Sequence, residues 1–213
     1  MQRMFDVVVS TVGLLLLLPL FAILAVLIKI EDGGPVFFGQ LRVGRHMRNF
    51  ILWKFRTMVP DAGSKGSQIT TAGDKRVTRV GVLLRRFKLD ELAQLLNVIR
   101  GDLSIVGARP ELPRYVEMFR EEYREILLNR PGITDPASIQ FRNEAELLQS
   151  ADWERIYVER ILPAKLKLSL KYARQRTFFS DIAIVMRTLG ALWMNNSRDS
   201  LGGEEYSGQK PVA

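Results

Sequence analysis

The chain has 213 residues, a hydrophobic fraction of 47% and no cysteine, which excludes a disulfide framework and thiolate chemistry. Its 31 Lys and Arg residues exceed its 23 Asp and Glu residues, and the net charge of +8 favours an anionic partner: a phosphorylated substrate, an anionic lipid or a nucleic acid. The single histidine, His46, excludes a multi-histidine metal site, so any catalysis must rest on carboxylates, hydroxyls, lysines or arginines.

The first segment is strongly apolar and predicts a membrane helix. No charged side chain occurs from Val7 to Ile28, and a straight helix of that length would reach about 33 Å, close to the thickness of the hydrocarbon core. Pro19 near its middle removes a backbone hydrogen bond, which predicts a kink. Positive charge flanks both ends, at Arg3 and at Lys29, and therefore favours the cytoplasm for both. A re-entrant helix satisfies both flanks, whereas a simple span is the alternative.

The segments that follow predict a small sheet and several helices. Apolar and aromatic residues alternate on both sides of Gly44-Arg45, which is typical of a β-hairpin. Residues 61–75 are rich in Gly, Ser and Thr and predict a loop. Three segments have the apolar spacing of helices: residues 76–87, 89–100 and 112–129.

A last helix is expected to begin at Ser180 and Asp181, whose side chains can cap it. One face of this helix is apolar and is surrounded by basic residues, so it either packs on the domain or lies in the lipid headgroup layer. The chain is therefore divided into a membrane helix (1–32), a folded domain (33–194) and a flexible tail (195–213). The apolar face consists of Ile182, Val185, Met186, Leu189, Leu192 and Trp193.

Two adjacent carboxylates, Asp90 and Glu91, open a predicted helix directly after Arg85, Arg86 and Lys88. The free amides and partial positive charge of a helix amino terminus, together with these cations, are expected to keep both carboxylates ionised. An ionised, partly desolvated aspartate can attack phosphorus as a nucleophile. Acidic residues in a first helical turn are also routine helix stabilisers, so the pair alone leaves both interpretations open.

Three sequence blocks together are more specific: WKFRTM at Trp53–Met58, LDELAQLLNVIRGDLSIVGARPEL at Leu89–Leu112, and RPGITDPASIQFRN at Arg130–Asn143. With the RxxD pattern at Arg3 and Asp6 they resemble the monotopic phosphoglycosyl transferases of the bacterial sugar transferase superfamily. The resemblance covers nearly all of the chain before the tail. It implies an α+β, mostly helical fold, in which a re-entrant membrane helix, a small β-hairpin and amphipathic interfacial helices surround a compact catalytic domain.

The resemblance also implies an activity. Such enzymes transfer a phosphosugar from a UDP-sugar to undecaprenyl phosphate, releasing UMP, in a ping-pong reaction. Asp90 matches the nucleophile that carries the phosphosugar covalently, and Glu91 matches the residue thought to help activate the polyprenol phosphate. Mg²⁺ is the implied cofactor, with Asp90 as its protein ligand. The implied substrate-binding residues are Arg85, Arg109 and Arg142, followed by Lys54, Arg130 and Asn97.

The implied location is the cytoplasmic face of a bacterial inner membrane, with UDP-sugar, undecaprenyl phosphate and membrane lipid as partners and the oligomeric state open. Three positions depart from the family pattern. Leu18 precedes Pro19 where the family has serine, and Ala108 opens the triplet that ends in Pro110. The block TDPASI at 134–139 replaces TGWAQV near the expected substrate pocket, so the sugar is not specified by the sequence.

A protein of a different class is the alternative, namely a membrane-tethered basic scaffold or nucleic-acid-binding protein. The net charge of +8 motivates it, and it predicts steeply salt-dependent binding to DNA or RNA. No helix-turn-helix or RNA-binding signature accompanies the charge, so no nucleic-acid partner is expected.

Overall fold

The structure is a computed structural model that describes residues 2–62, 74–144 and 152–199, with side chains up to residue 191. Most of the predicted loop at 61–75 and of the predicted tail lies outside these residues. The elements in chain order are α1 (Gln2–Asp32), β1 (Phe37–Val43), the 3-10 turn η1 (Arg45–Met47), β2 (Asn49–Phe55), α2 (Arg79–Arg86), the 3-10 turn η3 (Leu89–Ala93), α3 (Gln94–Arg100), β3 (Ser104–Val106), α4 (Pro113–Met118), α5 (Arg120–Ile126), β4 (Gly132–Thr134), α6 (Pro136–Gln140), α8 (Trp153–Ile156), the π-helical turn η4 (Tyr157–Ile161), α9 (Leu162–Gln175) and α10 (Phe178–Asp199).

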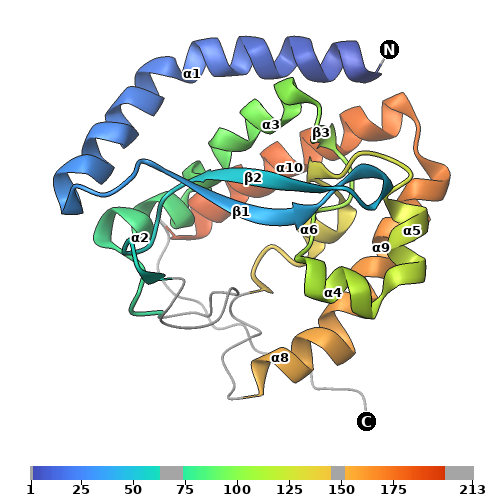
Figure 1. Cartoon of the computed structure of the whole chain (residues 1–213). Coiled ribbons are helices and arrows are strands. Elements are labelled where there is room, and N and C mark those ends of the chain that lie inside the picture. The colour runs from blue at the N-terminus through green and yellow to red at the C-terminus, as the bar shows by residue number, and fades with distance from the viewer. Residues whose placement is uncertain (1, 63–73, 145–151, 200–213) are drawn as a thin grey trace.

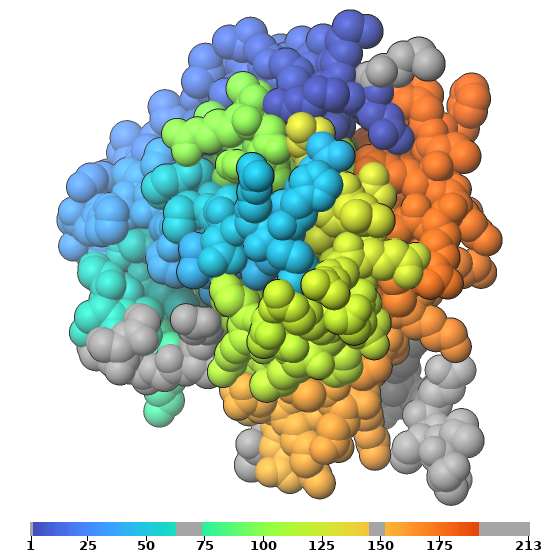
Figure 2. Space-filling view, turned by 45° about the vertical axis from the view of Figure 1, so that its right-hand side comes forward, coloured from blue at the N-terminus to red at the C-terminus, as the bar shows by residue number. Residues whose placement is uncertain are grey.

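Helix α1 is long, apolar and bent, and it lies along one edge of the molecule (Figures 1 and 2). Among the described residues it is the one helix long and apolar enough to cross a membrane. The helix continues through Pro19, and the bend in its middle agrees with the predicted kink. Its outward face is a row of exposed apolar side chains, which include Val8, Val12, Leu15, Leu16, Leu18, Ile23, Val26, Leu27 and Ile30.

The amino-terminal end of α1 is bonded to the domain beneath it. The guanidinium of Arg3 donates to the carbonyl oxygens of Val98 (2.6 Å) and Ile99 (3.0 Å), two of the last carbonyls of α3. Asp6 is buried and accepts a hydrogen bond from the Ser104 hydroxyl at the start of β3 (2.8 Å). The RxxD pattern therefore joins the amino-terminal end of α1 to α3 and β3.

The carboxyl-terminal end of α1 is bonded to the same domain. Phe21, Leu24 and Ile28 are buried in a cluster shared with β2, α2 and η3. Asp32 accepts two hydrogen bonds from the guanidinium of Arg56, one of them 2.6 Å long from Nη1, and this pairing lowers the pKa of Asp32 to about 2. Both ends of α1 thus contact one domain, with the apolar face of the helix turned outward.

The predicted hairpin is confirmed: β1 and β2 pair antiparallel, and Val43 lies opposite Asn49. The connection is longer than a two-residue turn and contains η1. Within it, His46 (φ 55°) and Met47 (φ 61°) adopt the left-handed conformation, which is uncommon for residues other than glycine. Leu52 on β2 is buried against α3 and β3.

Two of the three helices predicted for the middle of the chain are divided. Segment 89–100 forms η3 and then α3, and segment 112–129 forms α4 and α5. The second break lies at Phe119, whose φ of −125° and ψ of 44° are not helical. Helix α2 begins later than predicted because Thr78 caps it, its hydroxyl accepting a hydrogen bond from the amide of Gly81 (3.0 Å).

A second pair of strands, β3 and β4, is parallel and was not predicted. Each strand has three residues, too few for a visible alternation of apolar and polar side chains. The backbones of Gly107 and Gly132 meet here: a Cβ atom at Gly132 would lie 2.1 Å from the amide nitrogen of Gly107. The motifs around Arg109 and Arg130 therefore pack on each other.

Helix α10 begins before the predicted cap. Thr177 and Ser180 cap each other, since the amide of Ser180 donates to Oγ1 of Thr177 (3.1 Å) and the amide of Thr177 to Oγ of Ser180 (2.9 Å). Asp181 instead accepts from Arg176 at 2.9 Å. The prediction that Ser180 and Asp181 together cap this helix was wrong for Asp181, because a buried ion pair holds its carboxylate.

The part of the predicted apolar face of α10 that the structure describes is largely exposed. Ile184 and Thr188 point inward, and the Thr188 hydroxyl is 2.8 Å from that of Thr134. On the outer side Met186 and Leu189 are 63% and 56% exposed, which excludes core packing for them. Leu192 and Trp193 lie beyond the described side chains. The helix continues to Asp199, past the expected boundary at residue 194.

Candidate active site

The carboxylate pair lies in η3, the tight turn that joins α2 to α3 and lies against β2. Lys88 before it has a φ of 56°, a left-handed conformation that reverses the chain direction after α2. Such a conformation costs about 1 kcal/mol for a residue with a side chain. It places Asp90 inward, 7% exposed, at the start of the turn.

Glu91 is held by two cations from different parts of the chain. Both Nη atoms of Arg109, which follows β3, donate to its carboxylate, with Nη1 at 3.2 Å from Oε2. The ammonium of Lys54 on β2 is 3.4 Å from Oε1. Burial raises the pKa of Glu91, but the charges of Arg109 and Lys54 outweigh burial and lower it below the usual range. Glu91 is therefore ionised, as the sequence predicted.

Replacing Arg109 with lysine tests the two parallel hydrogen bonds from Arg109 to the Glu91 carboxylate. We expect Arg109→Lys to lower the free energy of unfolding by about 1 kcal/mol, because a single ammonium cannot make two parallel bonds to Glu91. Urea unfolding of the detergent-solubilised chain measures this. Arg120→Lys, whose arginine pairs with Glu117 on an exposed surface, is the matched control and should change stability by less than about 0.5 kcal/mol. Equal losses of stability in Arg109→Lys and Arg120→Lys would contradict a stabilising double hydrogen bond between Arg109 and Glu91.

Asp90 differs from its neighbour. Its Oδ1 atom is buried and has no hydrogen-bond partner among the described residues. Burial raises the pKa of Asp90, and the charges of Lys54 and Arg85 partly oppose the rise. Desolvation in η3 thus opposes the ionised form of Asp90 that the sequence predicts, and the nearby cations favour it. An unpartnered carboxylate oxygen beside cations is available to bind or attack an electrophile.

Arg85 of α2 is a further cation close enough to interact with Asp90. Its Nε donates to the hydroxyl of Thr57 (2.8 Å), a buried residue just after β2. Burial lowers the pKa of Arg85, and the charge of Asp90 opposes this. Thr57 was not singled out from the sequence, although it lies within the WKFRTM block. Lys54, Arg85 and Arg109 thus surround the two carboxylates.

Asn97 is fully buried and bonded on both sides of its amide. Its Oδ1 accepts from the backbone amide of Trp53 (2.9 Å), and its Nδ2 donates to the carbonyl of Ile51 (2.7 Å) and to Asp102 (3.0 Å). Because these bonds tie α3 to β2, we assign Asn97 a structural role instead of the substrate contact inferred from the resemblance.

Removal of the Asn97 amide tests that role. We expect Asn97→Ala to lower the free energy of unfolding by about 2–4 kcal/mol, because it removes three hydrogen bonds of a fully buried side chain and leaves the amide of Trp53 and the carbonyl of Ile51 without this partner. Thermal or urea unfolding measures the loss. Asn129→Ala, at an exposed asparagine, is the control and should be near neutral. A loss below about 0.5 kcal/mol for Asn97→Ala would exclude the bridging role.

The other two predicted arginines are not bonded to the carboxylate pair. Nε of Arg130 donates to the carbonyl of Gly101 (2.9 Å), at the end of α3 opposite to η3. Arg142 follows α6, is half-buried, and makes no hydrogen bond or ion pair with another described residue. Arg142 is therefore available to a ligand, whereas Arg130 lines a separate cavity with Arg3 and Arg45.

The carboxylates of this site could bind a divalent cation only if a substrate supplied further oxygen ligands. No group of three or more acidic or histidine side chains occurs among the described residues, so a cage made of protein alone is absent from them. Mg²⁺ commonly uses one or two carboxylates, substrate phosphates and water. The unpartnered, buried Oδ1 of Asp90 fits the protein's share of such a shell, while Glu91 is already occupied by Arg109.

The site is therefore a carboxylate pair enclosed by cations, on a domain with a long, outward-facing apolar helix. The chain belongs to the bacterial sugar transferase family, whose sequence model matches residues 1–195. This confirms the resemblance carried by the three sequence blocks.

Curated relatives support the same assignment. A UDP-N-acetylgalactosamine-undecaprenyl-phosphate N-acetylgalactosaminephosphotransferase of Aeromonas hydrophila is 37% identical over 193 residues, 88% of this chain and 42% of the relative. The exopolysaccharide production protein ExoY of Rhizobium meliloti is 34% identical over 209 residues, 91% of this chain and 86% of the relative. A UDP-glucose:undecaprenyl-phosphate glucose-1-phosphate transferase of Escherichia coli is 34% identical over 201 residues, 92% of this chain and 41% of the relative. The chain thus spans less than half of the first and third relatives.

Proposed function

We propose that the chain transfers a phosphosugar from a UDP-sugar to undecaprenyl phosphate, with Asp90 as the covalent carrier. The observation that carries the proposal is the buried, unpartnered carboxylate oxygen of Asp90 beside Lys54 and Arg85. The family membership and the activities for which the relatives are named support the substrates. The transferase of Aeromonas and that of E. coli differ in their sugar, so we propose no particular sugar.

In the first half of the reaction, the Asp90 carboxylate attacks the β-phosphorus of the UDP-sugar. The bond from this phosphorus to the bridging oxygen breaks, UMP leaves with that oxygen, and an acyl phosphate forms on Asp90. Negative charge grows on the leaving oxygen, and Lys54, Arg85 and Arg142 are the side chains proposed to stabilise it. Burial of Asp90 removes the water that would otherwise weaken these contacts.

In the second half, a phosphate oxygen of undecaprenyl phosphate attacks the phosphorus held on Asp90, and the carboxylate leaves unchanged. The family resemblance gives Glu91 a part in activating this acceptor. Since its pKa is lowered and Arg109 binds both oxygens, Glu91 is a weak base. We propose that Glu91 acts as a positioning residue, which holds Arg109 and Lys54 where the two phosphates meet.

Mg²⁺ is proposed as the cofactor, with Asp90 as its protein ligand. When bound, the cation would offset charge on the diphosphate. Lys54 and Arg85 supply the remaining positive charge from the chain itself, through direct contacts with phosphate oxygens.

We also propose that α1 enters the membrane and returns to the same face, the cytoplasmic face of a bacterial inner membrane, where UDP-sugars are made. Arg3 and Asp6 at one end of α1, and Asp32 at the other, all bond to one domain. A spanning helix would place its two ends on opposite sides of the bilayer, and one set of these bonds would be lost. The exposed apolar faces of α1 and α10 would contact lipid.

Two experiments test the proposal. The purified chain, incubated with Mg²⁺, undecaprenyl phosphate and individual UDP-sugars, should release UMP with at least one of them. No release from any UDP-sugar in the presence of acceptor would exclude the activity. For the membrane placement, a Gln2→Cys variant of this cysteine-free chain should resist an impermeant thiol reagent in intact cells and react after lysis. Labelling in intact cells would exclude the re-entrant arrangement.

A further inference from the structure

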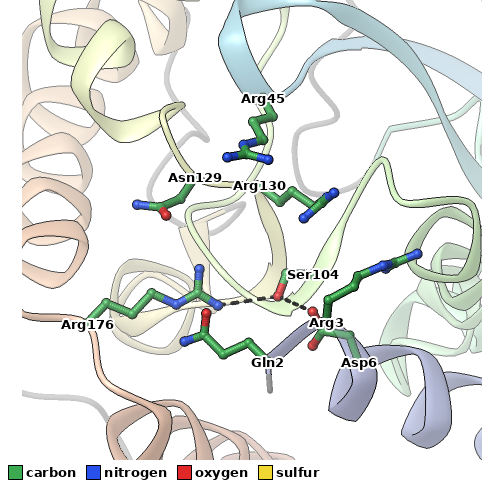
Figure 3. Close-up of a pocket in the computed structure, with 8 residues that line it drawn as sticks. All are labelled: Gln2, Arg3, Asp6, Arg45, Ser104, Asn129, Arg130 and Arg176. Atoms are coloured by element: carbon green, nitrogen blue, oxygen red, sulfur yellow. Dashed lines mark hydrogen bonds between the residues drawn. The ribbon is translucent and has the colours of Figure 1, made fainter.

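A cavity of about 300 Å³ lies beside the amino-terminal end of α1 (Figure 3). Its Arg130 bonds to Gly101, at the opposite end of α3 from Asp90. Four arginines from distant parts of the chain line it: Arg3 of α1, Arg45 of η1, Arg130 before β4, and Arg176 before α10. Figure 3 shows these side chains arranged around one space together with Asn129. The proposed transfer reaction uses none of this cavity.

Positive charge in the cavity exceeds negative charge. Asp6 is the one carboxylate among the described lining residues, and the Ser104 hydroxyl (2.8 Å) and a backbone amide already bond it. Arg176 is neutralised by Asp181, outside the lining. Arg3, Arg45 and Arg130 bond only to backbone carbonyl oxygens among the described residues.

Three arginines outside the cavity lining are arranged differently. Arg42, Arg56 and Arg109 each pair with a carboxylate at 2.8 Å or less. For Arg130, burial lowers the pKa, and the neighbouring charges of Arg3 and Arg45 lower it further. Like charges held together in this way repel one another until an anion enters.

We propose that this cavity binds the phosphate group of an anionic membrane lipid. A guanidinium can bind two phosphate oxygens, and the Nη atoms of Arg45 and Arg130 have no hydrogen bond to any residue that the structure describes. Arg3 and Asp6 directly precede the apolar run that begins at Val7, so the cavity lies at headgroup depth if α1 enters the bilayer as proposed above. The choice of a lipid over a soluble phosphate rests on that placement.

Binding to short-chain lipids tests the inference. The delipidated full chain in detergent is titrated with dihexanoyl phosphatidylglycerol, dihexanoyl phosphatidylcholine and inorganic phosphate, and dissociation constants are taken from shifts in thermal unfolding. We expect the phosphatidylglycerol to bind most tightly. Arg45→Gln should weaken it on the order of tenfold, and Asn129→Asp should weaken it through added negative charge. Arg48→Gln, at an exposed arginine outside the cavity lining, is the matched control and should change it by less than about twofold.

Two results would overturn the inference. Equal phosphatidylglycerol affinity in the wild type and in Arg45→Gln would remove the cavity as the site. Tighter binding of inorganic phosphate than of phosphatidylglycerol would assign the cavity to a soluble anion. Neither result depends on UMP release, so a failure of the proposed transfer reaction remains distinguishable.

Discussion

Asp90→Asn should reduce UMP release on the order of 10⁴-fold while the protein stays folded. The amide cannot form the acyl phosphate, and the surrounding cations alone give little rate. UMP release under saturating UDP-sugar and acceptor measures the loss. Asp152→Asn makes the same chemical change at a carboxylate that is 68% exposed on the surface, and it should leave the rate within about twofold.

The same substitution should raise stability near pH 7. Since burial raises the folded-state pKa of Asp90 above its unfolded value, the stability that Asp90 contributes is present at low pH and is lost as pH rises through the folded-state pKa. A neutral amide avoids this loss, so the variant should unfold at a higher urea concentration than wild type at pH 7, with the difference vanishing near pH 3. An Asp90→Asn protein that is active, or less stable than wild type at pH 7, would contradict the description of this site.

Gly132→Ala should unfold the chain or lower its free energy of unfolding by at least about 3 kcal/mol. The new Cβ would lie 2.1 Å from the amide nitrogen of Gly107 and 2.6 Å from the carbonyl carbon of Val106, and backbone atoms cannot rotate away as a flexible side chain does. The parallel contact between β3 and β4, which brings the Arg109 segment against the Arg130 segment, would be forced apart. Urea unfolding of the solubilised chain measures the loss.

Gly190→Ala is the matched control for this prediction. No atom lies within 4 Å of a Cβ at Gly190, which is exposed on α10, and alanine favours a helix over glycine by about 1 kcal/mol. It should therefore be neutral or stabilising. If Gly132→Ala retained wild-type stability, the close contact between the two strands would be wrong.

Features with a strong local signal were predictable from the sequence. The apolar run gave α1 with its bend at Pro19, and the alternation around Gly44 gave the hairpin. The family resemblance identified Asp90, Glu91 and Arg109, which the structure brings together. The structure also places Lys54 beside Glu91, although the two residues are far apart in the sequence.

Features set by tertiary contacts were not predictable. The boundary between segments 76–87 and 89–100 was predicted, but Lys88 carries no sequence signal for a positive φ, so its left-handed conformation was not. The family resemblance implied that Asn97 binds substrate, whereas in the structure its amide bonds to the backbone of β2. The rise in the pKa of Asp90 depends on burial in the folded chain, which no local pattern shows.

The most direct test of the central claim is the mass of the protein after reaction with UDP-sugar and Mg²⁺ in the absence of undecaprenyl phosphate. The proposal predicts an added mass of one phosphosugar on the intact chain, located at Asp90 by peptide mapping, and its loss on addition of undecaprenyl phosphate. UMP release by an active preparation without any such adduct, or an adduct that persists in Asp90→Asn, would contradict the covalent mechanism.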